Sequence, residues 1–317
     1  MQVPSLVRIG GGVSRSQLVA TLSELGAKKP LLVSDKFLES TGAVSQLTQL
    51  LQQHGIPFGV FSDTVEDPSV QVVEQCTAVC REGGYDCVIG FGGGSPIDTA
   101  KAVAVCAPNE GRIGEWKVPK QPPQGLPVLA IPTTAGTGSE ATKATVITDT
   151  DTCEKMLLMG PSLVPDAALV DFHWTRTKPF RLTADTGIDS LTHALEAFVS
   201  RKATAVTDAV ALRAAKLLYD NLRAACRAAR GGDDDTARAN MMLGAYLGGV
   251  AFSNSSVCLV HGMSRPLGAH FHVPHGLSNA MLLPRVTAFS VQDTEASHKY
   301  ADMARHLDIA SDTVTDK

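Results

Sequence analysis

The residue types best suited to chemistry gather in the second half of the sequence. In residues 187–196, GIDSLTHALE, Asp189 and His193 are four positions apart. On a helix this spacing puts both side chains on one face, one turn apart, where they can share an ion. An isolated Asp–His residue pair at this spacing also occurs as a plain surface contact. Asp189 and His193 therefore indicate a metal site only if further ligands accompany them.

A second stretch supplies those ligands. Residues 259–277, LVHGMSRPLGAHFHVPHGL, contain His261 and His275, with His270 and His272 between them. A buried core seldom contains so many polar rings, so these histidines are hard to explain by packing alone. Three imidazoles and one carboxylate suit a first-row divalent cation, either Fe2+ or Zn2+. We predict a metal centre, at which zinc ordinarily binds more tightly than ferrous iron.

A glycine-rich loop in the first half is the second candidate site. The sequence GFGGGSPID, residues 90–98, follows an apolar run and opens a helical pattern. Consecutive glycines let the backbone turn sharply and leave no side chain to obstruct a ligand. We expect Ser95 at the N-cap, Pro96 at the first helical position and Asp98 in the first turn. Bare amides there could bind a pyrophosphate, although a tight turn without a ligand also explains the sequence.

Two further features suit a dinucleotide. The loop PTTAGTGSE, residues 132–140, offers hydroxyl donors to phosphates and riboses, although a plain polar turn explains it equally well. Asp35 closes the apolar run PLLVSD. A carboxylate there could accept from an adenosine ribose 2′-hydroxyl and would repel a 2′-phosphate, favouring NAD over NADP. The alternative role for Asp35 is the N-cap of the following helix.

The hydrophobic pattern predicts the elements that position these residues. Four apolar runs predict short buried strands, at residues 30–35, 59–63, 86–92 and 127–133. Helical patterns lie between them, two of them ending before Gly26 and Gly55 and another covering residues 69–80. Strand–helix alternation implies a parallel sheet with helices on both faces. From Pro179 onward the pattern is helical, so we place domains at residues 1–178 and 179–317.

Composition narrows the function classes. The chain has 317 residues, a formal net charge of -4, 44% hydrophobic and 19% charged residues, with both signs interspersed. We therefore expect neither nucleic acid nor a membrane as partner. Neither a membrane span nor a secretory signal is expected, which favours a cytoplasmic protein. The seven cysteines lack CxxC pairs and are expected as reduced thiols.

Four motifs together resemble the iron-containing (group III) alcohol dehydrogenase family. They are GGGSPIDTAK (92–101), PTTAGTGSEAT (132–142), GIDSLTHALEAFVS (187–200) and LVHGMSRPLGAHFHVPHGLSNAMLLP (259–284). They occur in the family's order and spacing and span nearly the whole chain. The resemblance implies an α/β + all-α fold, similar to dehydroquinate synthase, in which an NAD-binding parallel-sheet domain precedes a helical metal-binding domain. It also implies a homo-oligomer.

The resemblance implies roles at matching positions. Four residues would be the metal ligands: Asp189, His193, His261 and His275. Ten would line the NAD site: Asp35, Gly92, Gly93, Gly94, Ser95, Asp98, Thr133, Thr134, Thr137 and Lys155. Asp35 falls where NAD-preferring members carry an acid, which makes NADP the less favoured cofactor. No catalytic residue beyond the metal ligands is assigned.

The chain departs from the family pattern in two ways. Members commonly carry a histidine four residues after the third ligand, where this sequence has Arg265. The family histidine is a candidate proton carrier, and Arg265 could instead recognise a carboxylate or phosphate on the substrate. Members also continue with further helices, so we expect a fragment, a truncated product or a shortened natural variant.

The expected reaction interconverts an alcohol and an aldehyde or ketone by hydride transfer to or from NAD, with a divalent cation holding the oxygen. Two alternatives stay open. One is a glycerol dehydrogenase or dehydroquinate synthase of the same superfamily. The motifs GIDSLTHALE and HGM…PHG favour an alcohol dehydrogenase over this alternative. The other is a truncated chain that binds NAD without turnover.

Overall fold

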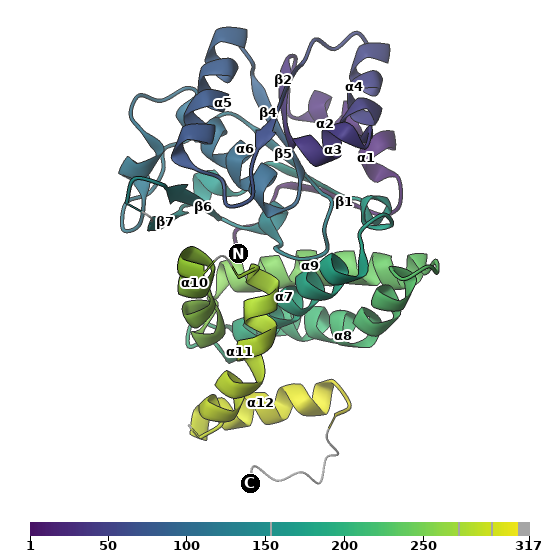
Figure 1. The fold of residues 1–317 in the computed structure, drawn as a ribbon, viewed down its shortest axis with the longest axis vertical. Helices are drawn as coiled ribbons and strands as arrows, with labels where there is room; N and C mark the ends of the chain where they lie inside the picture. Colours follow the sequence, from purple (N-terminus) through teal and green to yellow (C-terminus); the bar gives the residue numbers. More distant parts are fainter. Residues whose placement is uncertain (153, 272, 293, 310–317) are drawn as a thin grey trace. The chain divides into compact units, whose positions relative to one another are not determined.

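The computed structural model describes residues 1–152, 154–271, 273–292 and 294–309 (Figure 1). They form two compact units. The first contains Met1–Thr133 and Ser139–Trp174. The second contains Thr134–Gly138 and continues from Thr175 onward. The loop that follows the fourth apolar run is therefore shared between the units, a feature that the hydrophobic pattern does not reveal.

The first unit is built on a six-stranded parallel sheet. In sheet order its strands are β1 (Leu6–Ile9), β8 (Ala167–Val170), β5 (Val128–Pro132), β4 (Cys87–Gly92), β2 (Pro30–Asp35) and β3 (Gly59–Thr64). The four predicted strands are confirmed as β2, β3, β4 and β5. Every residue of β4 and β5 is buried, because a parallel sheet is covered on both faces.

Helices cover both faces of the sheet. They are α1 (Val13–Ser16), α2 (Leu18–Glu24), α3 (Lys36–Ser40), α4 (Ala43–Gln53), α5 (Val70–Gly83) and α6 (Gly94–Cys106). Adjacent residues of β4 enter different cores: Val88 packs in the core that includes residues of α5 and α6, and Ile89 in the core with α2 and α4. Gly26 and Gly55 follow α2 and α4 with φ of 70° and 66°, the left-handed conformation that ends a helix.

A β-hairpin was not predicted from the sequence. Strands β6 (Ala144–Asp149) and β7 (Glu154–Met159) pair antiparallel with each other, outside the six-stranded sheet. Four short 3-10 helices complete the described elements before the helical unit: η1 (Ile113–Trp116), η2 (Ser139–Ala141), η3 (Pro161–Leu163) and η4 (Phe172–Thr175). Cys153 lies outside the described residues; the other six cysteines are free thiols, as expected.

The second unit is helical, as predicted. Its helices are α7 (Phe180–Val199), α8 (Ala205–Ala228), α9 (Asp235–Asn254), α10 (Leu259–Phe271), α11 (His275–Ser290) and α12 (Thr294–His306). Small side chains bring α7, α8 and α9 close together: a Cβ on Gly187 would lie 2.4 Å from Leu222 Cδ1. Among the described residues no single helix is long and apolar enough to span a membrane, although the bent pair α9–α10 passes by length and composition together.

Candidate metal centre and cofactor loop

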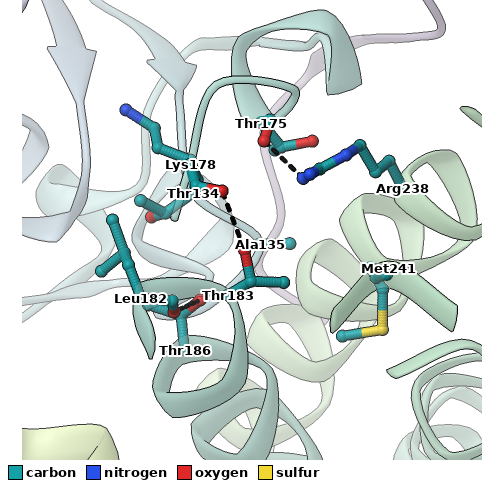
Figure 2. Close-up of a pocket in the computed structure, with 10 residues that line it drawn as sticks. Thr134, Ala135, Thr175, Lys178, Leu182, Thr183, Thr186, Arg238 and Met241 are labelled. Carbon is teal, nitrogen blue, oxygen red and sulfur yellow. Dashed lines mark hydrogen bonds between the residues drawn. The ribbon is translucent and has the colours of Figure 1, made fainter. Parts of the chain in front are cut away.

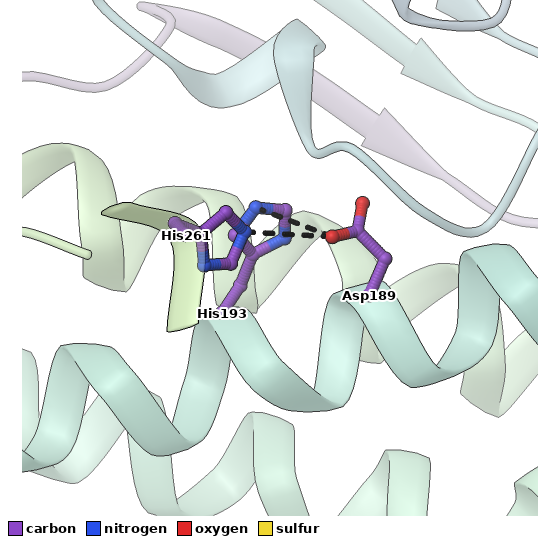
Figure 3. A group of neighbouring side chains, drawn as sticks. All are labelled: Asp189, His193 and His261. Carbon is purple, nitrogen blue, oxygen red and sulfur yellow. Dashed lines mark ion pairs between the residues drawn. The ribbon is translucent and has the colours of Figure 1, made fainter. Parts of the chain in front are cut away.

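The second unit brings the predicted metal ligands together. Asp189 and His193 lie one turn apart on α7, His261 lies in the first turn of α10, and His275 is the first residue of α11. The Nε2 atoms of the three histidines surround one carboxylate oxygen, Asp189 Oδ1. This oxygen is 3.4 Å from Nε2 of His261, 3.6 Å from that of His275 and 3.9 Å from that of His193. Figure 3 shows the two buried imidazoles facing this oxygen.

A buried glutamate orients His261. Glu196 Oε2 lies 2.6 Å from His261 Nδ1, and its Oε1 accepts from the backbone N–H of Val260 at 2.6 Å. Burial would raise the pKa of Glu196, but the bond from His261 prevails and lowers it, so the carboxylate is ionised. With Nδ1 donating to Glu196, Nε2 is the ring nitrogen of His261 that faces Asp189; burial opposes a charge on this ring, but the two carboxylates prevail and raise its pKa. Carboxylates of this kind fix the tautomer of metal-binding histidines.

A chain of hydroxyls orients His275. Ser278 Oγ donates to the His275 carbonyl oxygen at 2.9 Å, so the Ser264 hydroxyl must donate to Ser278 Oγ, 2.6 Å away. Ser264 Oγ can then only accept from His275 Nδ1, at 3.1 Å. Nε2 is therefore the ring nitrogen that His275 turns towards Asp189. Its side chain is 44% exposed, against 2% for His261, so the centre opens on the His275 side.

Burial keeps His193 neutral. Its ring is stacked between Phe252 and His261, with centroids 4.3 and 4.5 Å away, and its Nδ1 is buried without a hydrogen bond among the described residues. Burial lowers the pKa of His193 to about 3, despite the attraction of Asp189. A neutral imidazole beside an ionised carboxylate is the protonation state that a divalent cation requires of its ligands.

The donor set fits a divalent cation. Ligand distances of about 2.0–2.2 Å put the atoms of a tetrahedral shell roughly 3.4 Å apart, close to the separations around Asp189 Oδ1. Burial opposes ionisation of Asp189, but His193, His275 and His261 together hold the pKa of this carboxyl far below its usual range. Asp189, His193 and His261 offer ligand atoms within 4.8 Å of one another. The residues present can hold Fe2+ or Zn2+.

Two polar residues of this centre were not predicted from the sequence. Glu196 follows His193 by three positions on α7 and is 2% exposed. Asn279 follows His275 by four positions on α11 and is fully buried. Glu196 is seven positions after Asp189, and residues at i, i+4 and i+7 share one face of a helix. Extending the face of Asp189 and His193 by one turn would therefore have found Glu196. His270, between the ligands, is exposed, and His272 lies outside the described residues.

The glycine loop forms the predicted strand-to-helix turn, but the helix begins two residues earlier than predicted. The N-cap of α6 is Gly93, so Ser95 is the second helical residue instead of the N-cap, Pro96 is the third instead of the first, and Asp98 lies beyond the first turn. The cause is Gly92, whose φ of 155° lets the chain enter the helix early. A Cβ on Gly92 would lie 2.5 Å from Pro96 Cγ, so the turn tolerates only glycine there. The backbone amides at Gly94 and Ser95 head the helix, as a pyrophosphate site requires.

Asp98 is tied to the protein on both oxygens. Its carboxylate accepts from Ser139 Oγ at 2.5 Å and from the backbone N–H of Val146 at 2.9 Å. These bonds join α6 to η2 and to the β-hairpin. Burial raises the pKa of Asp98, against the attraction of Lys101. The observed role of Asp98 is to position these segments, and a direct contact with NAD stays a prediction.

A buried lysine and glutamate lie next to Asp98. Lys101 Nζ donates to Thr142 O, Thr142 Oγ1 and Ala144 O at 2.9–3.0 Å. Burial lowers the pKa of Lys101 to about 8, against the attraction of Asp98 and Glu140. Burial also raises the pKa of Glu140 to about 7. Ionising Glu140 in the folded protein therefore costs stability.

This burial predicts a pH-dependent stability. Since the folded pKa of Glu140 is raised, its favourable contribution is complete below about pH 4.5 and is lost as the pH rises to about 7. Glu140→Gln removes this loss, so its unfolding free energy relative to wild type should rise by on the order of 1–3 kcal/mol between pH 5 and 8. Urea unfolding of both proteins at the two pH values measures this. An equal difference at both would contradict the prediction.

The remaining predicted cofactor residues occupy ordinary structural positions. Asp35 caps α3, with Oδ1 accepting from the Leu38 N–H at 2.8 Å, which confirms the N-cap role and leaves the ribose contact a prediction. Lys155 on β7 pairs with Asp67 at 2.7 Å. Thr133 is buried at the end of β5, where its N–H donates to the Gly92 carbonyl at 2.8 Å.

The loop carrying Thr134 and Thr137 packs within the second unit. A Cβ on Gly138, whose φ is 62°, would lie 2.6 Å from Gly249 Cα, so this glycine permits backbone contact with α9. Ser190 Oγ on α7 donates to the carbonyl of Gly136 at 2.6 Å. Close packing therefore explains the glycines of this loop without a ligand. The hydroxyls of Thr134 and Thr137 stay candidates for cofactor contact.

Thr134 also lines a pocket inside the second unit (Figure 2). Arg238, 3% exposed, donates to the carbonyl of Thr175 there. The hydroxyls of Thr183 and Thr186 donate to the carbonyls of Lys178 and Leu182. These two hydroxyl protons are therefore already used within the protein, while the cationic side chains of Lys178 and Arg238 also line the pocket. None of the four metal ligands lines it.

The fold and the candidate ligand set are those expected of a metal-dependent oxidoreductase, and comparisons with known proteins identify the family. The sequence pattern described as iron-containing alcohol dehydrogenase matches residues 4–172, and that of the Fe-containing alcohol dehydrogenase C-terminal region matches residues 183–317. The chain belongs to the iron-containing alcohol dehydrogenase family. It is an oxidoreductase of alcohols and aldehydes.

Individual relatives agree with this assignment. Long-chain-alcohol dehydrogenase 1 of Geobacillus thermodenitrificans is 41% identical over 290 residues, covering 90% of this chain and 72% of the relative. The NAD-dependent methanol dehydrogenase of Bacillus methanolicus is 38% identical, covering 91% and 75%. The crystal structure of a 1,3-propanediol oxidoreductase superposes with a TM-score of 0.93 at 34% identity, covering 99% of this chain and 81% of that one.

Proposed function

We propose that this chain oxidises a small alcohol, or reduces the corresponding aldehyde or ketone, with NAD as cofactor and a divalent cation held by Asp189, His193, His261 and His275. The observation that carries the proposal is the convergence of three Nε2 atoms on Asp189 Oδ1. NAD use is supported by the NAD-dependent methanol dehydrogenase among the relatives.

The protein's part in this chemistry is to hold and orient groups. A bound cation would act as a Lewis acid that polarises an alcohol or carbonyl oxygen. Glu196 and Ser264 keep the Nε2 atoms of His261 and His275 directed at the centre. The exposed edge at His275 is where a substrate oxygen could approach. NAD would supply the hydride acceptor, so no side chain of this chain has to be oxidised or reduced.

The first unit supports cofactor binding through its glycine loop. A Cβ on Gly92 would meet Pro96 in the first turn of α6, and the backbone amides that head this helix favour a pyrophosphate. Asp35, at the carboxyl end of β2, keeps one oxygen for a ribose hydroxyl, which favours NAD over NADP. Gly94, Ser95, Thr133, Thr134, Thr137 and Lys155 complete the proposed cofactor set. A cytoplasmic homo-oligomer stays a prediction from the sequence.

We further propose that Arg265 recognises an acidic group on the substrate. It lies one turn after His261 on α10, is exposed, and makes no hydrogen bond or ion pair with the described residues. Arg265→Met should lower kcat/KM for hydroxy acids about 10–100-fold and leave simple alcohols unaffected, because a charged hydrogen bond is lost. Arg285→Met, which removes an exposed arginine from α11, is the matched control. Equal losses for both substrate classes would contradict this role.

The activity itself is tested by substrate turnover. Purified protein loaded with Fe2+ or Zn2+ is mixed with NAD and a panel of alcohols and hydroxy acids, and the absorbance of NADH is followed. We expect sustained NADH formation with at least one alcohol, and NADH consumption with the matching aldehyde. Binding of NAD without turnover of any substrate would instead favour a non-catalytic chain.

A further inference from the structure

Asn279 lies at the metal centre, although it is not one of the proposed ligands. It follows His275 by one turn of α11 and has no exposed surface. Its Nδ2 donates to Asp189 Oδ1 at 2.6 Å and lies 3.2 Å from His261 Nε2 and 3.3 Å from His275 Nε2. One amide group therefore contacts three of the four proposed ligands.

The chemistry of the neighbours fixes the orientation of this amide. If the amide were reversed, its carbonyl oxygen would face the ionised carboxylate of Asp189 at the same short distance, and two acceptors would repel each other. With the NH2 group facing Asp189, the Oδ1 atom is buried and has no hydrogen bond among the described residues. An unpaired buried carbonyl costs about 1–3 kcal/mol. A leucine of similar shape would avoid that cost, which indicates that the NH2 group has a function.

We propose that Asn279 is a positioning residue of the metal centre. Its NH2 group holds Asp189 Oδ1 in the direction of the three imidazole nitrogens, because the terminal torsion of an aspartate is otherwise broad. The inference rests on the metal centre proposed above and extends it to a residue that neither binds the cation nor titrates. Removing such a partner from a ligand typically weakens metal affinity 10–100-fold.

The test is Asn279→Leu, which removes the NH2 donor and the unpaired carbonyl together. The dissociation constant for Zn2+, measured by competition with a chromophoric chelator, should rise about 10–100-fold. The visible spectrum of the Co2+-loaded protein should change, because the Asp189 oxygen is no longer held. Thermal unfolding of the chelator-treated protein should change little, because the lost donor to Asp189 Oδ1 is offset by the removal of the unpaired Asn279 Oδ1.

A matched control is Asn240→Leu. Asn240 on α9 donates to Asn221 Oδ1 at 3.1 Å in the same unit, away from the four ligands. Its Zn2+ affinity and Co2+ spectrum should equal those of the wild type. Unchanged Zn2+ affinity and Co2+ spectrum in Asn279→Leu would overturn the inference. So would weaker binding that is accompanied by earlier unfolding of the chelator-treated protein, which is the result of a structural role. If the wild-type protein bound no Zn2+, the metal centre itself would be refuted. This result differs from a failure of the Asn279 inference alone, in which the wild type binds Zn2+ and the variant binds it equally well.

Discussion

His261→Ala is expected to abolish metal retention and turnover together. The substitution removes one of three imidazoles around Asp189 Oδ1 and leaves the buried carboxylate of Glu196 without its partner at 2.6 Å. Loss of a ligand and of its orienting bond should lower the metal content after dialysis to background and turnover by at least about 1,000-fold, since the cation contributes several kcal/mol to the transition state. Metal analysis and NADH formation measure both quantities.

His270→Ala is the matched control for this variant. His270 is an exposed histidine near the end of the same helix, so its loss should change neither metal content nor turnover. The NAD affinity of His261→Ala should equal that of wild type, because the glycine loop belongs to the other unit. Wild-type metal content and activity in His261→Ala would refute the ligand assignment.

Gly92→Ala is expected to have the opposite pattern, with metal retained and NAD binding lost. The added Cβ would lie 2.5 Å from Pro96 Cγ, and the φ of 155° is one that alanine rarely adopts. The first turn of α6 must therefore shift. Strain and overpacking should lower the unfolding free energy by about 1–3 kcal/mol. NAD affinity should fall tenfold or more, about 1.4 kcal/mol.

Calorimetric NAD titration, urea unfolding and metal analysis of Gly92→Ala test these expectations. Gly262→Ala is a suitable control, because a Cβ at Gly262 on α10 meets no other atom within 4 Å. This control should be as stable as wild type and bind NAD equally. If Gly92→Ala bound NAD with wild-type affinity although its stability had fallen, the glycine loop would not be the pyrophosphate site.

The hydrophobic pattern predicted most of the central sheet because burial on both faces leaves a clear signal. Strands such as β4 and β5 are continuous apolar runs, bounded by glycine and proline. The edge strand β1, LVRI, is only four residues long and partly exposed, so its pattern is too short to recognise. The β6–β7 hairpin was missed because its half-buried strands lack such runs.

The metal centre could be predicted only in part. Asp189 and His193 are related by helix geometry, which the sequence contains directly. Their proximity to His261 and His275 depends on how α10 and α11 pack against α7, which no local spacing determines. Glu196 and Asn279 were missed because a carboxylate or amide on a helix ordinarily faces solvent. Only the fold shows them to be buried among the ligands.

The division of one loop between the two units could not be predicted from the sequence either. Residues 132–140 read as a single polar turn, but Thr133 and Ser139 belong to the first unit and Thr134–Gly138 to the second. The glycines of this loop pack against helices that lie more than 50 positions later in the chain; Gly136, for example, accepts a hydrogen bond from Ser190 on α7. Long-range packing of this kind leaves no periodic pattern in the sequence.

Metal dependence is tested most directly by NADH formation in one preparation, assayed as purified, after stripping with a chelator, and after anaerobic reloading with Fe2+ or Zn2+. An enzyme whose centre is Asp189, His193, His261 and His275 should lose its activity on stripping and recover it with at least one of the two metals. Activity that survives complete removal of metal, with metal content verified on the same sample, would contradict a role for this metal centre in catalysis.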